Sequence, residues 1–155
     1  MTSKCLIGMP QHQKYRKLID ECSTILPGVL THIFNLGFNP DTGGICKTFD
    51  LNNRKPVNSD MPWWSLPETI RTCCNILSLY PDCPQSKEIV GIAAKCSNVF
   101  ASKYINYNVH MMAYQTLNES GEIAAAIPAT PDADPGYHTG LSLIDSIKQL
   151  QTLKQ

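Results

Sequence analysis

The sequence predicts an all-α protein with about four to five helices and two small β-hairpins in its long loops. Apolar residues recur at three- and four-residue steps in four segments. Stretches rich in glycine, proline and asparagine separate these segments. The connections alternate between short and long, which is typical of a barrel of helical hairpins whose long loops gather at one end.

Length and composition indicate one globular domain over residues 1–155, with residues 1–12 irregular. The chain is 43% hydrophobic and 17% charged, so it can form a packed core. Thirteen basic residues balance thirteen acidic ones, and no basic stripe marks a nucleic-acid or membrane partner. No apolar run approaches the ~20 residues that cross a bilayer. The first eight residues are too short and polar for a signal peptide.

The first half of the chain predicts a helix, a hairpin and a second helix. The first helix covers about Gln13 to Phe34, and Pro27-Gly28 should kink or split it. A hairpin near Ile45–Lys55 follows, turning at Asn52-Asn53. The second helix starts with Ser65-Leu66-Pro67-Glu68, which has the pattern of a capping box.

The second half predicts a third helix over about Ser86 to Tyr104, a weak hairpin and a last helix. The hairpin covers Val109–Ile127 and turns around Asn118–Gly121. The last helix covers about Thr139 to Leu153. Because four helices cannot close a barrel of twelve, we expect exposed apolar faces and self-association. The face expected to be exposed contains Ile89, Ile92, Cys96 and Val99.

Seven cysteines without a CxxC pair predict buried free thiols rather than a zinc site. Reduced thiols, together with the lack of a signal peptide, predict a cytoplasmic protein. The sequence has no GxGxxG, Walker or HExxH motif, so we expect no cofactor and no metal.

The first candidate site is Trp63-Trp64 followed by Glu68. Adjacent tryptophans cannot share one face of a helix or strand, so one should pack and the other should be available to a ligand. An aromatic face suits the C–H surface of a sugar ring, and a carboxylate suits its hydroxyls. The structural alternatives are a capping role for Glu68 and a hydrophobic staple for the tryptophans.

The second candidate site is Tyr137-His138, which leads into the last helix. A helix N-terminus disfavours the protonated form of a histidine, which favours a neutral general base. The structural alternative is a packing or capping histidine. The other histidines have no such context.

Taken in order, these motifs resemble the C-terminal part of the N-acylglucosamine 2-epimerase family, over about residues 15–150. That family folds as an (α/α)6 barrel of six helical hairpins and includes sugar epimerases and aldose–ketose isomerases. The resemblance rests on Gly43-Gly44-Ile45, Phe49-Asp50, Trp63-Trp64 with Glu68, Glu122 in a turn, and Tyr137-His138.

The resemblance implies that Glu68 and His138 are catalytic and that Trp63, Trp64 and Tyr137 bind a small sugar substrate. It also implies an incomplete site. The family's first catalytic histidine, in a Gly-His-x-x-Glu motif, has no counterpart, and Leu141 stands where the family often has arginine. Epimerisation at carbon two needs an acid–base group on each face, and His138 serves one of them. If active, the chain would be an isomerase.

Two other functions stay open on the sequence. A glycoside hydrolase of the same barrel fold would pair Glu68 with Asp60, Asp132 or Asp134, roughly 5–10 Å apart. A non-catalytic sugar-binding or partner protein would keep the fold without the chemistry.

Overall fold

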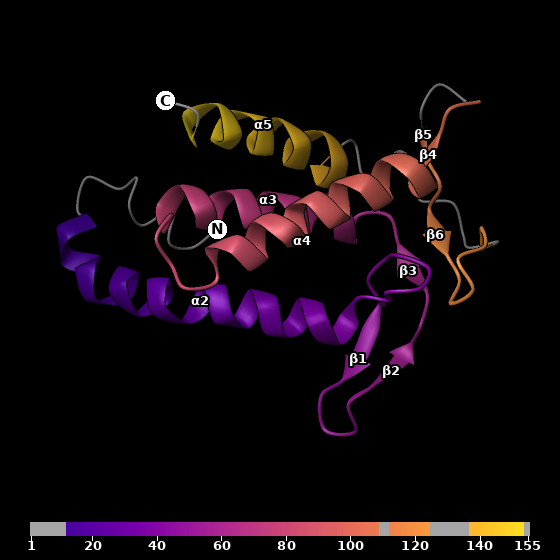
Figure 1. Ribbon diagram of the computed structural model, residues 1–155, viewed down its shortest axis with the longest axis horizontal. Coiled ribbons are helices and arrows are strands. Elements are labelled where there is room, and N and C mark those ends of the chain that lie inside the picture. Colours follow the sequence, from indigo (N-terminus) through magenta and orange to yellow (C-terminus); the bar gives the residue numbers. More distant parts are fainter. Residues whose placement is uncertain (1–11, 109–111, 125–136, 154–155) are drawn as a thin grey trace.

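The computed structural model describes residues 12–108, 112–124 and 137–153 (Figure 1). A short 3-10 turn, His12–Tyr15, leads into helix α2 (Arg16–Gly37). The other helices are α3 (Ser65–Leu79), α4 (Ser86–Val99) and α5 (Ser142–Leu153). A π-helical turn, Phe100–Tyr104, extends α4, and another, Tyr137–Leu141, precedes α5. The described chain is therefore mostly helical, as the sequence predicts.

The four helices form two layers. In one layer α2 contacts α4, and in the other α3 contacts α5; α3 also packs extensively on α4. Helices α2 and α4 both end, and α3 and α5 both begin, at the end of the molecule where the strands gather (Figure 1). Helices within a layer are thus parallel, and the two layers are antiparallel. The long loops lie at one end and the short α3–α4 connection lies at the other.

Helix α2 continues through Pro27-Gly28, so the expected split there is wrong. Proline lacks one backbone donor, which weakens the helix locally. The Pro27 side chain is nevertheless buried, on the same side of the helix as Thr31 and Phe34. Packing of this buried face holds the two halves together as one helix.

Helix α3 does not use the expected capping box. Ser65 lies inside the first turn, and its hydroxyl donates to the Pro62 carbonyl at 2.7 Å. The Glu68 carboxylate instead contacts side chains outside its own turn. The N-cap position is Trp64, which makes no side-chain capping bond. Glu68 is therefore directed toward other elements rather than toward the helix terminus.

The first predicted hairpin is confirmed, with a later start. Strand β1 (Thr48–Asp50) pairs antiparallel with β2 (Lys55–Asn58). The Asp50 carboxylate accepts hydrogen bonds from the backbone N–H groups of Asn52 and Asn53, which closes the turn. The Asn53 side-chain amide also donates to Asp50 Oδ2 at 2.6 Å, and this bond, followed by the backbone bonds, holds the pKa of Asp50 below its usual value.

The second predicted hairpin is confirmed next to its turn, but its first arm also pairs with strands outside it. Strand β5 (Met112–Ala113) pairs with β4 (Ile105–Asn106), and β6 (Thr116–Leu117) pairs with β3 (Met61–Pro62). The tight turn at Asn118 exists, and Leu117 bridges to Ile123 beyond it. Val109 and Ile127 lie outside the described residues. The buried side chains of Met61 and Leu117 explain why β6 joins the earlier strand.

The Gly43-Gly44 pair sits where the chain crosses the core. Gly44 has φ +145°, and a Cβ there would come within 2.7 Å of Met61 Sδ. The fully buried Tyr104 donates to the Met61 carbonyl at 2.9 Å beside it. Glycine is therefore required by both conformation and space.

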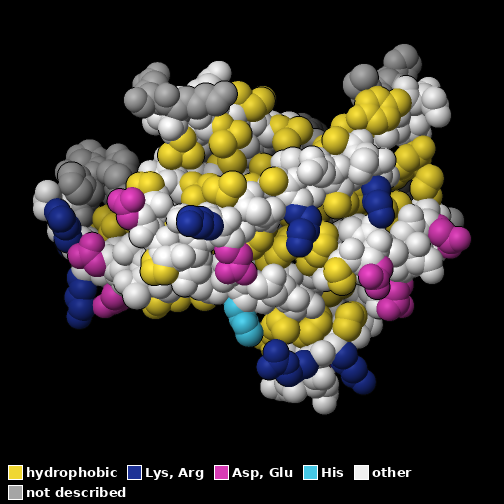
Figure 2. Space-filling view, viewed as in Figure 1, with side chains coloured by type: hydrophobic (Ala, Val, Ile, Leu, Met, Phe, Trp, Pro, Cys, Tyr) yellow, Lys and Arg dark blue, Asp and Glu magenta, His cyan; other side chains and the backbone are white. Residues whose placement is uncertain are grey.

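The exposed apolar faces are not the one that the sequence predicts. Ile89, Ile92 and Cys96 are buried between α4 and its neighbours, and Val99 is partly buried. Helices α2 and α3 both pack against α4 and cover these residues. Most of the exposed large apolar residues belong instead to α2 and α5, at the two outer edges of the assembly, and Figure 2 shows apolar side chains gathered over α5. These residues are Leu18, Ile25, Val29 and Ile33 of α2, and Leu141, Ile144, Ile147, Leu150 and Leu153 at α5.

The buried face of α4 predicts a large stability difference between two neighbouring residues. Ile89 is fully buried and Val90 is 54% exposed. Ile89→Ala should lower the free energy of unfolding by about 2–5 kcal/mol, because it leaves a cavity. Val90→Ala should change it by less than about 0.5 kcal/mol. Urea unfolding measures both, and equal effects would contradict the packing of α4.

Thiol labelling tests the same core. The six described cysteines are free, and Cys73, Cys74 and Cys96 are buried. Burial raises the pKa of the Cys73 thiol and raises that of Cys96 to about 12. Since the thiolate is the reactive form, these two and Cys74 should label at pH 8 only after unfolding, whereas Cys22 and Cys83 label in the folded protein. Peptide mapping by mass spectrometry reads this order, and early labelling of Cys96 would contradict it.

Candidate functional site

The structure brings Glu68 and His138 together, although 70 positions separate them. Glu68 lies in the first turn of α3, and His138 lies in the π-helical turn that precedes α5. Their Oε1 and Nδ1 atoms are 3.0 Å apart. An ionised carboxylate only accepts, so the bond places the proton on Nδ1 and makes Nε2 the basic nitrogen of the neutral ring. The predicted convergence of these two side chains is confirmed.

Both tryptophans pack around the histidine ring. The Trp64 ring lies 5.6 Å from the His138 ring centroid at an interplanar angle of 36°. The Trp63 ring lies 6.4 Å away and nearly perpendicular, at 82°. Trp63 is partly buried against the core, whereas Trp64 is 37% exposed. One tryptophan thus packs and the other presents a face to solvent, as the sequence predicts.

Arg71 completes the cluster and was not assigned a role from the sequence. Its guanidinium donates to Glu68 Oε2 at 2.6 Å, and only 6% of its side chain is exposed. The two Glu68 oxygens therefore face different partners, Arg71 on one side and His138 on the other. The spacing of three residues along one helix face is the sequence signal that could have identified Arg71.

A polar seam between α3 and α5 fixes where His138 lies. The Asn75 amide donates to Asp145 Oδ2 at 3.4 Å, one α3 turn beyond Arg71. Ser142 and Ser146 of α5 are also buried, and the Ser146 hydroxyl donates to the Ser142 carbonyl at 2.7 Å. The Asn75–Asp145 bond crosses between the two helices and so restricts the register of α5 on α3. That register places His138 beside Glu68.

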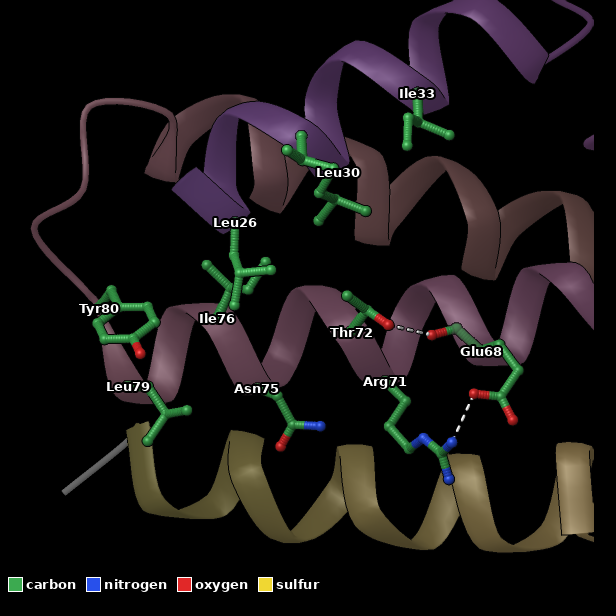
Figure 3. A pocket seen from close by; sticks show the side chains of 11 residues that line it. Leu26, Leu30, Ile33, Glu68, Arg71, Thr72, Asn75, Ile76, Leu79 and Tyr80 are labelled. Atoms are coloured by element: carbon green, nitrogen blue, oxygen red, sulfur yellow. Dashed lines mark hydrogen bonds and ion pairs between the residues drawn. The ribbon is translucent and has the colours of Figure 1, made fainter. Parts of the chain in front are cut away.

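A cavity of about 260 Å³ lies next to this cluster, between α2 and α3 (Figure 3). Figure 3 shows Glu68, Arg71 and Asn75 on the α5 side of α3, while Leu26 and Leu30 of α2 face the cavity from the opposite side. The wall is largely apolar, and Glu68, Arg71 and Asn75 lie along its α5 side. Six apolar side chains line it: Leu26, Val29, Leu30, Ile33, Ile76 and Leu79.

The remaining sequence predictions fall outside this cluster. Tyr137 starts the π-helical turn, but its side chain lies outside the described residues, as do Asp132 and Asp134. Glu122 accepts from Asn118 Nδ2 in the β6 turn. The part of the chain that the structure describes contains no group of three or more His, Cys, Asp or Glu that could hold a metal, and none of its helices is long and apolar enough to cross a membrane.

The cluster combines one hydrogen-bonded base, one carboxylate with a buried cation, and an aromatic face. This arrangement can hold a polar ring and accept or return a proton on one side of it. Comparison with known proteins adds no further assignment: no protein-family model matches the chain, and a search of curated proteins gives no match.

The buried Arg71 predicts the energetic role of Glu68. Removing the carboxylate charge abolishes the 2.6 Å ion pair of the buried Arg71 guanidinium, so Glu68→Gln should destabilise the fold by on the order of 3 kcal/mol. The double variant Glu68→Gln/Arg71→Met removes both charges and should recover much of this loss. Glu88→Gln, at an exposed carboxylate that accepts from Asn35, serves as the control and should change little. Thermal unfolding compares them, and a double variant no more stable than Glu68→Gln would contradict the pairing.

Proposed function

We propose that the chain binds a small sugar at the Trp64–Glu68–His138 cluster and that its fold is part of an (α/α)6 barrel of the N-acylglucosamine 2-epimerase type. The observation that carries the proposal is the 3.0 Å contact between Glu68 and His138 beside an exposed tryptophan face. Capping or isolated packing roles give no reason for these side chains to meet.

The helix arrangement supports the barrel part of the proposal. A barrel of helical hairpins has an inner and an outer layer, each made of parallel helices, with the layers antiparallel. The α3–α5 and α2–α4 layers have this relation. Glu68 and His138 each lie at the start of a helix of the same layer, so both open toward the loop-bearing end.

The chemistry of the cluster favours binding over turnover. Glu68 orients His138 through Nδ1, which leaves Nε2 as the nitrogen able to take a proton from carbon two of an open-chain sugar. Return of the proton on the opposite face needs a second acid–base group, and the sequence has no counterpart of the Gly-His-x-x-Glu motif whose histidine supplies it in the resembling family. We therefore assign the chain a sugar-binding role related to epimerases and isomerases, without efficient epimerisation by the chain alone.

The hydrolase alternative has less support than a non-catalytic sugar-binding role. A hydrolase would need Glu68 to act on the scissile bond, whereas both Glu68 oxygens are engaged, one by a cation and the other by an imidazole. The exposed edges of α2 and α5 support self-association as a further part of the proposal. The free thiols support its cytoplasmic, reducing setting.

Sugar binding should depend on Glu68 and Trp64. In saturation-transfer NMR with a panel of reducing monosaccharides and disaccharides, the wild-type chain should bind weakly. Trp64→Ala should abolish the signal, because it removes the stacking face. Glu68→Ala should also abolish it, provided that circular dichroism shows a folded chain. Tyr107→Ala, at an aromatic residue that is 61% exposed in the β4 loop, should leave binding unchanged.

Isotope exchange tests the catalytic half of the proposal. The chain alone should incorporate little or no deuterium at carbon two of any bound sugar in D₂O, because one face of the reaction is unserved. Robust exchange would show that the absent histidine is not required. Binding that survives both Trp64→Ala and Glu68→Ala would contradict the assigned site.

A further inference from the structure

The two edges of the helical assembly expose apolar surfaces of different shape. At one edge, the cavity between α2 and α3 forms an open groove, which we call the α2 edge. At the other edge, α5 presents a ridge that includes Ile144, Ile147 and Leu150, each about half exposed. We call this ridge the α5 edge. A groove at one end and a ridge at the other can fit together, whereas neither fits a copy of itself equally well.

The contact between α4 and α3 shows which neighbouring helix the α2 edge lacks. The chain alternates between the two layers, and strand-bearing loops join α2 to α3 and α4 to α5. Helix α4 packs mainly on α3, the helix that precedes it, through Ile89, Ile92 and Cys96. By the same rule, α2 should pack on a preceding helix of the other layer. Among the described residues no helix takes that position, and the groove stays open.

Helix α5 has the properties of the absent helix. It belongs to the same layer as α3 and runs parallel to it, as the helix filling the groove must. Its exposed ridge is apolar, like the wall of the groove formed by Leu26, Val29 and Ile33. The internal α3–α4 interface would thus continue from one copy to the next. We propose that copies of this chain associate head to tail, with the α5 edge of one copy seated in the α2 edge of its neighbour.

Such a contact joins different surfaces, so it must either close into a ring or extend into a fibre. The number of copies in a closed ring rests on the proposed function, which assigns the fold to an (α/α)6 barrel. Four helices are a third of the twelve in such a barrel, so three copies would complete the ring. Closure would also bring three Glu68–His138 pairs to the same rim.

Mass measurement on the intact chain tests the contact and its closure separately. Light scattering after size exclusion should give three times the 17.2 kDa chain mass. Val29→Glu at the α2 edge and Ile147→Glu at the α5 edge should each give folded monomers. Val90→Glu, at a similarly exposed apolar residue of α4, should remain a trimer.

Mixing the two edge variants provides the decisive measurement. Each variant keeps one intact edge, so an equal mixture should form a one-to-one heterodimer, which also shows that both variants are folded. A wild-type monomer would overturn the proposal. An edge variant that keeps the wild-type oligomer mass would also overturn it. A contact between two identical edges involves only one kind of edge, so changing the other edge would have no effect. An open series of oligomers that both variants abolish would support the head-to-tail contact and refute the closed barrel. A wild-type trimer that binds no sugar would refute the proposed binding site and leave the head-to-tail contact supported.

Discussion

The structure depends on α3, because this helix must bury two chemically different faces at once. Its apolar face, with Leu66, Ile70 and Cys73, packs into the core beside α4. Its polar face carries Glu68 and buried Arg71 toward α5. Burying a guanidinium is costly unless a carboxylate accompanies it. The Arg71–Glu68 pair therefore fixes the position of Glu68, and α5 must bring polar groups to the same interface.

The site follows from this arrangement. Because α5 meets α3 through a polar seam, its register is restricted, and His138 arrives within hydrogen-bond distance of Glu68. The tryptophans stand immediately before α3, so the same helix start supplies the aromatic surface. A structural need, a counter-ion for Arg71, and a chemical arrangement, an oriented imidazole, thus share one carboxylate. The double variant Glu68→Gln/Arg71→Met separates these two roles, because it removes the carboxylate together with the cation that it pairs with.

Sequence reasoning predicted the helices and the cluster better than it predicted pairings and exposure. Helical periodicity and turn residues are local signals, and they located α3, α4 and the β1–β2 hairpin. Strand β6 pairs with Met61–Pro62 across more than 50 residues, and no local pattern encodes such a partner. Ile89 and Ile92 were expected to be exposed because counting helices says nothing about which side is covered. The role of Arg71 was missed because burial of a charge depends on tertiary contacts.

The exposed edges connect incomplete packing to incomplete chemistry. In this two-layer wall, a helix of one layer packs on the preceding helix of the other layer, as α4 packs on α3. Helix α2 has the same apolar face but an open groove in front of it. The rim of that groove carries Glu68, so whatever fills the groove also forms a wall beside the candidate site. Filling the groove would therefore complete the packing of α2 and the wall beside Glu68 at once, so the proposed assembly and the proposed sugar site share one surface.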